Sequence, residues 1–270
     1  MAKTAMWDRS MAEQWKFYKP PIRPSEADLQ IFRKYITEKI AEKGDDLKIL
    51  ILGSTPELRS LVHTFNLPVW VCDYIEENYR ELGTLVPHKG KETYIHQDWI
   101  TLDLSEQFDL IFAEASPNVV KQEDVPKVLG NAARHLKEDG VFLAKVWTRR
   151  AEIMPIEDIL KIYREKFADQ DFMHAMAVQI YTLCHDSTIP GTPLLAIRKM
   201  LEKYHAQGLV TDEELQTCAN IINEKTKLCL FFPLHEEWDL LFSKDFTTMH
   251  RYEPEPIGPD PVPIYALRKK

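Results

Sequence analysis

The sequence has 270 residues, of which 44% are hydrophobic and 28% are charged, and its formal net charge is −8. A chain of this length can bury the core of one sizeable domain or of a domain with an insertion. The acidic balance argues against general affinity for nucleic acid or for anionic membranes. No apolar run approaches the roughly 20 residues that span a bilayer, and residues 1–15 lack the features of a secretory signal. We therefore expect a cytoplasmic protein with no membrane partner.

The four cysteines are Cys72, Cys184, Cys218 and Cys229. They show neither C-x-x-C spacing nor nearby paired histidines, which zinc sites require. We expect reduced, buried thiols and no bound metal.

Residues 1–45 combine an aromatic, basic segment with one helix. Three prolines between positions 20 and 24 favour an extended connector over residues 7–24. Ser25 is a candidate N-cap, with Asp28 placed to complete a capping box. Apolar residues then follow at helical spacing until Gly44, a candidate C-cap.

Residues 46–150 alternate between short apolar runs and helical segments. The runs are rich in Ile, Leu and Val, as buried parallel strands are. They are residues 47–53, 68–74, 93–99, 108–115 and 140–147. Helical patterns lie between them, notably over residues 56–65 and 125–138. This alternation predicts an open, mostly parallel sheet with helices on both faces.

The alternation stops after Trp147. Residues 151–244 are predicted to form a helical insertion without strands, in which Thr211 and Glu214 form a capping box. Strand character returns over residues 245–270, in FTTMHRYEP and VPIYALRKK. No helix-length segment separates these two runs, so they must pair antiparallel.

Polar residues stand at the carboxyl ends of the predicted strands, where open α/β sheets bind ligands. Gly53, Ser54 and Thr55 form a strand-to-helix turn that lets a ligand approach the backbone. Asp73, followed by Tyr74, ends the second strand about 20 residues later, the spacing at which a carboxylate accepts the hydroxyls of a ribose. A plain turn and a solvated acid are the structural alternatives.

The third and fourth strands end in further candidates. Asp98 can accept a hydrogen bond from an exocyclic adenine amine, and Trp99 can border a slot for the ring, although such a tryptophan is more often part of a core. Glu114, Ala115 and Ser116 follow the fourth strand, where the reactive end of a ligand would lie. Glu114 could equally cap the next helix.

The ordered set ILILGSTPELR, VWVCDY, HQDW and FDLIFAEASPNVV, followed by HLKEDGVFLAKVW, resembles the class I S-adenosylmethionine-dependent methyltransferases. The resemblance covers roughly residues 47–147. That family closes its sheet with an antiparallel hairpin strand, whereas an NAD-type Rossmann domain continues with parallel strands. The resemblance implies an α/β fold, a three-layer Rossmann-like sandwich. Its mostly parallel seven-stranded sheet would carry an antiparallel C-terminal hairpin and a helical insertion.

The resemblance also implies S-adenosylmethionine as the cofactor. The Gly53 turn would lie against its methionine portion and ribose, Asp73 would hold the ribose hydroxyls, and Asp98 with Trp99 would frame the adenine. Glu114 and the two residues after it would line the path to the sulfonium. The chain departs from the family in its first loop, which keeps only one glycine and lacks the acid that often precedes it.

Methyl transfer is an in-line displacement that depends mainly on orientation and desolvation. Glu114 is the first candidate for a general base, followed by His174 or His185. Arg23, in the N-terminal segment, is a candidate partner for the cofactor's carboxylate.

The loop after the fourth strand lacks the Asn/Asp-Pro-Pro-aromatic pattern associated with methylation of planar amines in nucleic acids and glutamine. Together with the acidic balance, this favours a small-molecule acceptor and makes nucleic acid an unfavoured partner. The helical insertion would then form a lid over the acceptor. Two alternatives stay open. The glycine-poor loop suggests a non-catalytic cofactor-binding or protein-interaction module, and the generic glycine turn suggests an NAD-dependent oxidoreductase.

Overall fold

The computed structural model describes residues 11–149, 151–152, 154–168, 172, 176, 180, 192–222, 229–254 and 262–270. The main strands are β1 (Ile49–Leu52), β2 (Val69–Cys72), β3 (Glu92–Ile95), β4 (Phe108–Glu114), β5 (Leu136–Lys145), β8 (Phe246–Tyr252) and β9 (Ile264–Lys269). They form one seven-stranded sheet in the order β3-β2-β1-β4-β5-β9-β8. The first five strands are parallel to one another, and β9 is antiparallel to both β5 and β8. The predicted sheet and its C-terminal hairpin are confirmed.

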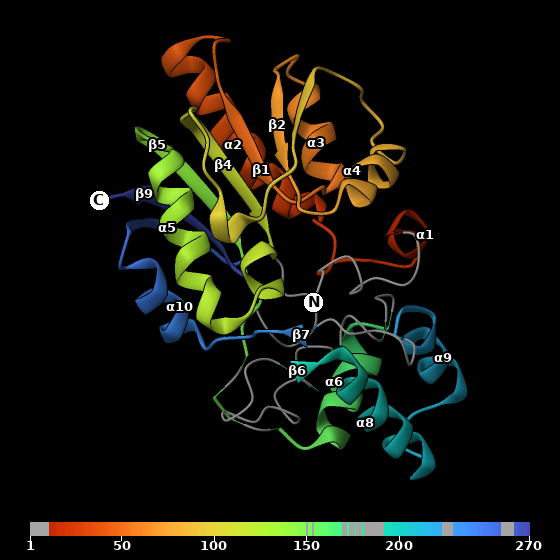
Figure 1. The fold of residues 1–270 in the computed structure, drawn as a ribbon. Coiled ribbons are helices and arrows are strands. Elements are labelled where there is room, and N and C mark those ends of the chain that lie inside the picture. The colour runs from red at the N-terminus through yellow and green to blue at the C-terminus, as the bar shows by residue number, and fades with distance from the viewer. Residues whose placement is uncertain are drawn as a thin grey trace.

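Helices cover both faces of this sheet and complete three layers (Figure 1). On one face α2 (Glu26–Lys43) and α3 (Pro56–His63) pack against Ile49 and Ile51 of β1. On the other face α5 (Val125–His135) and α10 (His235–Phe242) pack in the same core as Leu50 and Leu52. Successive side chains of a strand point to opposite faces, so a strand covered on both sides is apolar throughout.

A third buried cluster joins the helical insertion to the end of the sheet. It contains α6 (Ile156–Lys166), α8 (Leu194–Ala206) and α9 (Asp212–Ile221). Trp15 and Tyr18 of the N-terminal segment and Trp147, just beyond β5, belong to the same cluster. Figure 1 shows the three helices gathered on one side of the sheet. The N-terminal segment and the insertion therefore meet near the carboxyl ends of the parallel strands.

The expected helix caps are confirmed. Ser25 and Asp28 form a reciprocal capping box at the start of α2, and Gly44 ends that helix with a φ of 75°. Thr211 and Glu214 form the same arrangement at the start of α9. Side-chain oxygens thus satisfy backbone donors that the first turn of a helix leaves without partners.

Two secondary-structure predictions are wrong over short segments of the chain. The insertion contains two short strands, β6 (Thr192–Pro193) and β7 (Cys229–Leu230), which pair antiparallel. The predicted connector contains the helix α1 (Met11–Trp15), because the prolines that exclude a helix begin only at position 20. The N-terminal helix packs on α4 (Glu76–Gly83).

The end of α5 also differs from the prediction. The helix was expected to continue to Glu138, but it ends at His135, because Leu136 is extended and pairs with Phe108 of β4. Regular pairing resumes only at Val141, opposite Leu110, so the intervening residues form an irregularity in β5.

The cysteine prediction also needs correction. The thiols of Cys72 and Cys218 are buried, whereas that of Cys229 is exposed, and Cys184 lies outside the described residues.

No helix in the described part of the chain combines the length and the apolar character needed to cross a bilayer.

A buried ion network lies at the amino end of β3. Arg59 Nε and Nη2 donate to the two carboxylate oxygens of Glu92 at 3.0 and 2.6 Å. His63 Nε2 lies 2.9 Å from the same carboxylate, and the Tyr79 hydroxyl donates to it at 3.0 Å. Burial alone would raise the pKa of Glu92, but the hydrogen bonds from His63, Arg59 and Tyr79 outweigh it and lower this pKa to about 2.

We expect Glu92→Gln to destabilise the protein by about 1–2 kcal/mol at pH 7, after allowing for solvent screening. Because the folded-state pKa is lowered, the stabilisation is present above about pH 4.5 and is lost as the pH falls towards 2. Urea denaturation at pH 7 and at pH 3 should show a smaller difference between variant and wild type at pH 3. Glu106→Gln, which affects a half-exposed pair with Lys48, is the control. An equal deficit of the Glu92 variant at both pH values would contradict this assignment.

Candidate functional site

The chain turns sharply at Gly53, directly after β1. Its φ of +107° is strained for any residue with a side chain. A Cβ atom built there would lie 3.8 Å from both Ser116 Oγ and Trp99 Cζ2. The order of strands in the sheet reverses between β1 and β4, which is the switch point where open α/β sheets bind ligands. The three loops that follow β1, β3 and β4 therefore converge at this point.

Asp73 lies next to this turn, at the end of β2. Ser54 Oγ donates to Asp73 Oδ2 at 2.6 Å, and the backbone N–H of Ile75 donates to Oδ1 at 2.9 Å. Burial raises the pKa of Asp73, and these hydrogen bonds oppose the shift. A carboxylate oxygen accepts more than one hydrogen bond, so the fixed carboxylate can still receive hydroxyl donors. Thr55 is the buried N-cap residue of α3 and makes no side-chain capping bond.

The loop after β3 is fixed to the end of β2. Trp99 Nε1 donates to the carbonyl oxygen of Cys72 at 2.9 Å. Asp98 caps the short 3-10 turn that follows, accepting from the N–H of Ile100 at 3.1 Å. Asn131 of α5 donates to the carbonyl oxygens of both Trp99 and Ile100. These bonds hold the loop in one position beside Asp73.

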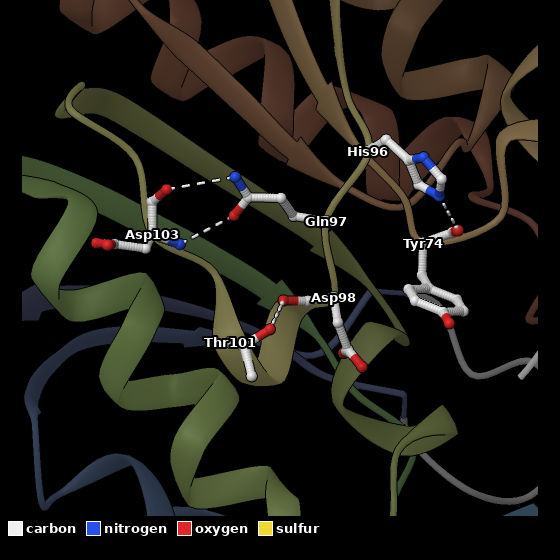
Figure 2. Close-up of a pocket in the computed structure, with 6 residues that line it drawn as sticks. All are labelled: Tyr74, His96, Gln97, Asp98, Thr101 and Asp103. Atoms are coloured by element: carbon white, nitrogen blue, oxygen red, sulfur yellow. Dashed lines mark hydrogen bonds between the residues drawn. The ribbon is translucent and has the colours of Figure 1, made fainter. Parts of the chain in front are cut away.

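A hollow of about 550 Å³ opens between these loops. Its lining residues are Tyr74, His96, Gln97, Asp98, Thr101 and Asp103. In Figure 2 the side chains of Tyr74 and Asp98 extend to the same side, whereas Gln97 turns the other way, toward Asp103. Gln97 forms two hydrogen bonds with the backbone of Asp103, which brace that wall. The volume is within the range of small-molecule sites.

Glu114, at the end of β4, is buried beside Lys145 of β5. Lys145 Nζ lies 2.8 Å from Glu114 Oε1 and 2.9 Å from Asp28 Oδ2. The same ammonium donates to the carbonyl oxygens of Pro21 at 2.9 Å and of Arg23 at 3.3 Å. One buried lysine thus attaches the N-terminal segment and α2 to the carboxyl edge of the sheet.

Burial raises the pKa of Glu114 to about 7, although the charge of Lys145 opposes the shift. A carboxyl group that titrates near neutral pH can take up a proton under working conditions. The other two candidate bases, His174 and His185, lie outside the described residues.

Arg23 is engaged by Glu57, the second residue of α3. Its Nε and Nη2 lie 2.8 and 2.5 Å from Glu57 Oε1, and Trp15 Nε1 donates to the same oxygen at 3.1 Å. Arg23 therefore lies at the edge of the site, with its side chain 35% exposed, but it is already paired with an acid. Neither Glu57 nor Lys145 was predicted from the sequence as a site residue. Glu57 stands in the motif STPELR, two residues after Thr55, and could have been found there.

The loop after β4 contains a residue in the left-handed conformation and is hydrogen-bonded to the ends of β1 and β5. Ala115 adopts a left-handed conformation with a φ of 54°, and its N–H donates to the carbonyl oxygen of Lys145 at 3.0 Å. Ser116 donates its hydroxyl to the carbonyl oxygen of Leu52. Residues with strained backbone conformations, such as Ala115, are frequent at functional sites.

Asn118 completes this loop and is fully buried. Its Oδ1 accepts from the N–H of Trp147, and its Nδ2 donates to the carbonyl oxygens of Trp147 and Phe231. The amide is therefore satisfied by the protein itself.

The described residues contain no group of three His, Cys, Asp or Glu side chains arranged to hold a metal ion.

No protein-family model and no curated protein matches the sequence. A structure from Rhodobacter sphaeroides that carries the name of a Zn-dependent alcohol dehydrogenase has a TM-score of 0.58 and 14% identity. That match covers 98% of this chain and all of that one. The N-methyltransferase NodS of Bradyrhizobium japonicum WM9 has a TM-score of 0.50 and 7% identity, over 96% of this chain and 97% of that one.

The magnesium protoporphyrin IX methyltransferase ChlM of Synechocystis PCC 6803 also has a TM-score of 0.50, with 10% identity over 95% of this chain and 93% of that one. At these identities the likeness concerns the fold. The antiparallel β9 distinguishes this sheet from the dinucleotide-binding arrangement, whose sixth strand is parallel. The chain therefore has the fold of the class I S-adenosylmethionine-dependent methyltransferases.

Proposed function

We propose that the chain binds S-adenosylmethionine at the carboxyl edge of its sheet and transfers the methyl group to a small-molecule acceptor. The observation that carries this proposal is the convergence of the Gly53 turn, the Ser54–Asp73 pair and the Asp98–Trp99 loop at the switch point. NodS and ChlM, which share the fold, were crystallised with S-adenosylhomocysteine. That compound is what S-adenosylmethionine becomes when its methyl group has left.

The residues fit such a ligand part by part. Asp73 is fixed by two donors and would accept the ribose hydroxyls. The adjoining hollow, with Tyr74 and Asp98 on its wall, would receive the adenine. The Gly53 turn and the two residues after it would lie along the methionine portion, where the backbone comes closest to the crevice.

S-Adenosylmethionine supplies a methyl group activated by a sulfonium, so the chain needs mainly to orient the acceptor and exclude water. Glu114 would take the proton of an acceptor N–H or O–H, because its pKa of about 7 leaves it partly ionised at neutral pH. Trp147 and the apolar helices of the insertion would shield the reacting groups from solvent.

Two observations support a small-molecule acceptor. Asn118 stands in the loop where methyltransferases of planar amines place a substrate-binding amide, but its amide is already occupied by backbone groups of Trp147 and Phe231. The buried cluster of the insertion also packs close to the end of β5, where it would restrict access to large substrates.

Asp73→Ala is expected to weaken S-adenosylmethionine binding by about 100-fold, since it removes two hydrogen bonds to the ribose. Isothermal titration of the wild type and the variant measures this. Glu106→Ala is the matched control, because that carboxylate pairs with Lys48 and does not line the hollow. Unchanged affinity in the Asp73 variant would refute the assigned site.

Two further measurements separate the alternatives. An NAD-dependent oxidoreductase would bind NADH, seen as enhanced fluorescence of the nicotinamide, and would not require S-adenosylmethionine. A non-catalytic module would bind S-adenosylmethionine but yield no S-adenosylhomocysteine with any member of an acceptor library. Either result would replace the methyltransferase proposal.

A further inference from the structure

The two carboxylate oxygens of Glu57 have different environments. Oε1 accepts from Trp15 Nε1 and Arg23 Nε and contacts Arg23 Nη2. Oε2 is buried and has no hydrogen-bond partner in the described part of the chain. Buried polar atoms are almost always paired, and a charged oxygen without a donor is costly, so a donor from outside the described residues is favoured there.

The charges around Glu57 indicate the sign of that group. Among the described residues, three acids, Asp28, Glu57 and Glu114, share this buried region with two cations, Arg23 and Lys145. When all five are ionised, one negative charge is in excess. Burial, and then the charges of Asp28 and Glu57, raises the pKa of Glu114, which places these acids within electrostatic reach of one another. A bound cation with hydrogen-bond donors would balance the charge.

The position of Glu57 indicates which part of a ligand would supply the cation. Glu57 lies in the first turn of α3, which follows the Gly53 turn along which the methionine portion of the proposed cofactor would rest. That portion ends in an ammonium and a carboxylate. β1 is apolar throughout, so the acid that often precedes the first loop in this fold is missing. Glu57 approaches the same loop from the helix side.

We infer that Glu57 Oε2 accepts a hydrogen bond from the α-ammonium group of the cofactor's methionine portion, while Arg23 holds Oε1 through two of its nitrogens. This inference rests on the proposed function. It assigns Glu57 a binding role that was not predicted from the sequence motifs.

The test combines Glu57→Gln with three probes in isothermal titration. S-Adenosylhomocysteine carries the ammonium, its desamino analogue lacks only that group, and 5′-methylthioadenosine lacks the whole amino-acid portion. The wild type should bind S-adenosylhomocysteine most tightly. Glu57→Gln should weaken that binding by about 10- to 100-fold, as for a lost hydrogen bond to a charged group. It should change the affinities for the other two probes by less than about threefold.

Trp15→Phe is the matched control, because it removes a donor to Oε1 and leaves Oε2 unchanged. It should keep the preference for S-adenosylhomocysteine over the desamino analogue. Equal losses for all three probes in Glu57→Gln would reveal a structural role and overturn the inference, as would no loss for any of them. A loss of the preference in Trp15→Phe would also overturn it. If the wild type binds none of the probes, the proposed function itself fails.

Discussion

Lys145→Met is expected to lower the free energy of unfolding by about 3–5 kcal/mol at pH 8. The substitution removes the ammonium that lies between the carboxylates of Asp28 and Glu114 and leaves both buried without their counter-ion. It also removes the donor to the carbonyl oxygen of Pro21. Urea denaturation followed by circular dichroism measures the loss.

This loss should depend on pH in a definite direction. Without the ammonium, burial of the Glu114 carboxyl group is no longer opposed, so this group binds a proton more tightly in the folded state than in the unfolded one. The stability of Lys145→Met should therefore rise as the pH falls from 8 towards 5. Adding Glu114→Gln should restore part of the stability, because one of the two uncompensated charges is removed.

Lys127→Met provides the control for Lys145, since Lys127 forms a solvent-exposed pair with Asp124. Pairs of that kind contribute little to stability, so this variant should unfold almost like the wild type. If Lys145→Met were no less stable than Lys127→Met, the buried cluster would not have the role described here.

Asn118→Ala is expected to cost about 3 kcal/mol. Its side chain satisfies three backbone groups that water does not reach, the N–H and carbonyl oxygen of Trp147 and the carbonyl oxygen of Phe231. Each buried backbone group that is left without a hydrogen-bond partner costs about 1–3 kcal/mol. One of them, the Trp147 carbonyl oxygen, keeps the indole donor of Trp238. The estimate is therefore below the sum of three complete losses.

Asn131→Ala is the comparison for this variant, because Asn131 also donates to two backbone carbonyl oxygens but is only partly buried. Its thermal unfolding midpoint should fall by less than that of Asn118→Ala. The reverse order would show that the buried amide is not the stronger link.

The parts of the fold that could be predicted are those whose signal is local. β1 and β2 are continuous apolar runs because both of their faces are covered, and the hairpin of β8 and β9 follows from two strand patterns without a helix between them. The end of α5 and the pairing of β6 with β7 could not be predicted in this way. Leu136 leaves the helix to pair with Phe108, and this pairing leaves no local signal because the two residues are distant in sequence. Strands of two residues, such as β6 and β7, are too short to show a periodic pattern.

The candidate site divides along the same line. Gly53 and Asp73 could be assigned because the topology of parallel strands brings their carboxyl ends to one edge. The pairing of Arg23 with Glu57 and the position of Lys145 were not accessible, because an ion pair across 34 residues of chain and a hydrogen bond across 122 leave no local pattern. The orphaned oxygen of Glu57 becomes visible only when its three-dimensional surroundings are known.

The attachment of the N-terminal segment has a consequence for sequence variation. Lys145 holds that segment through main-chain carbonyl oxygens at positions 21 and 23, which every amino acid possesses. The side chains there can change while the attachment persists. The number of residues between it and the capping box at Ser25 cannot, since one insertion would carry both carbonyl groups out of reach of the ammonium. Divergent versions of this protein should therefore vary more in composition at position 21 than in the length of this stretch, while Arg23 should persist as the partner of Glu57.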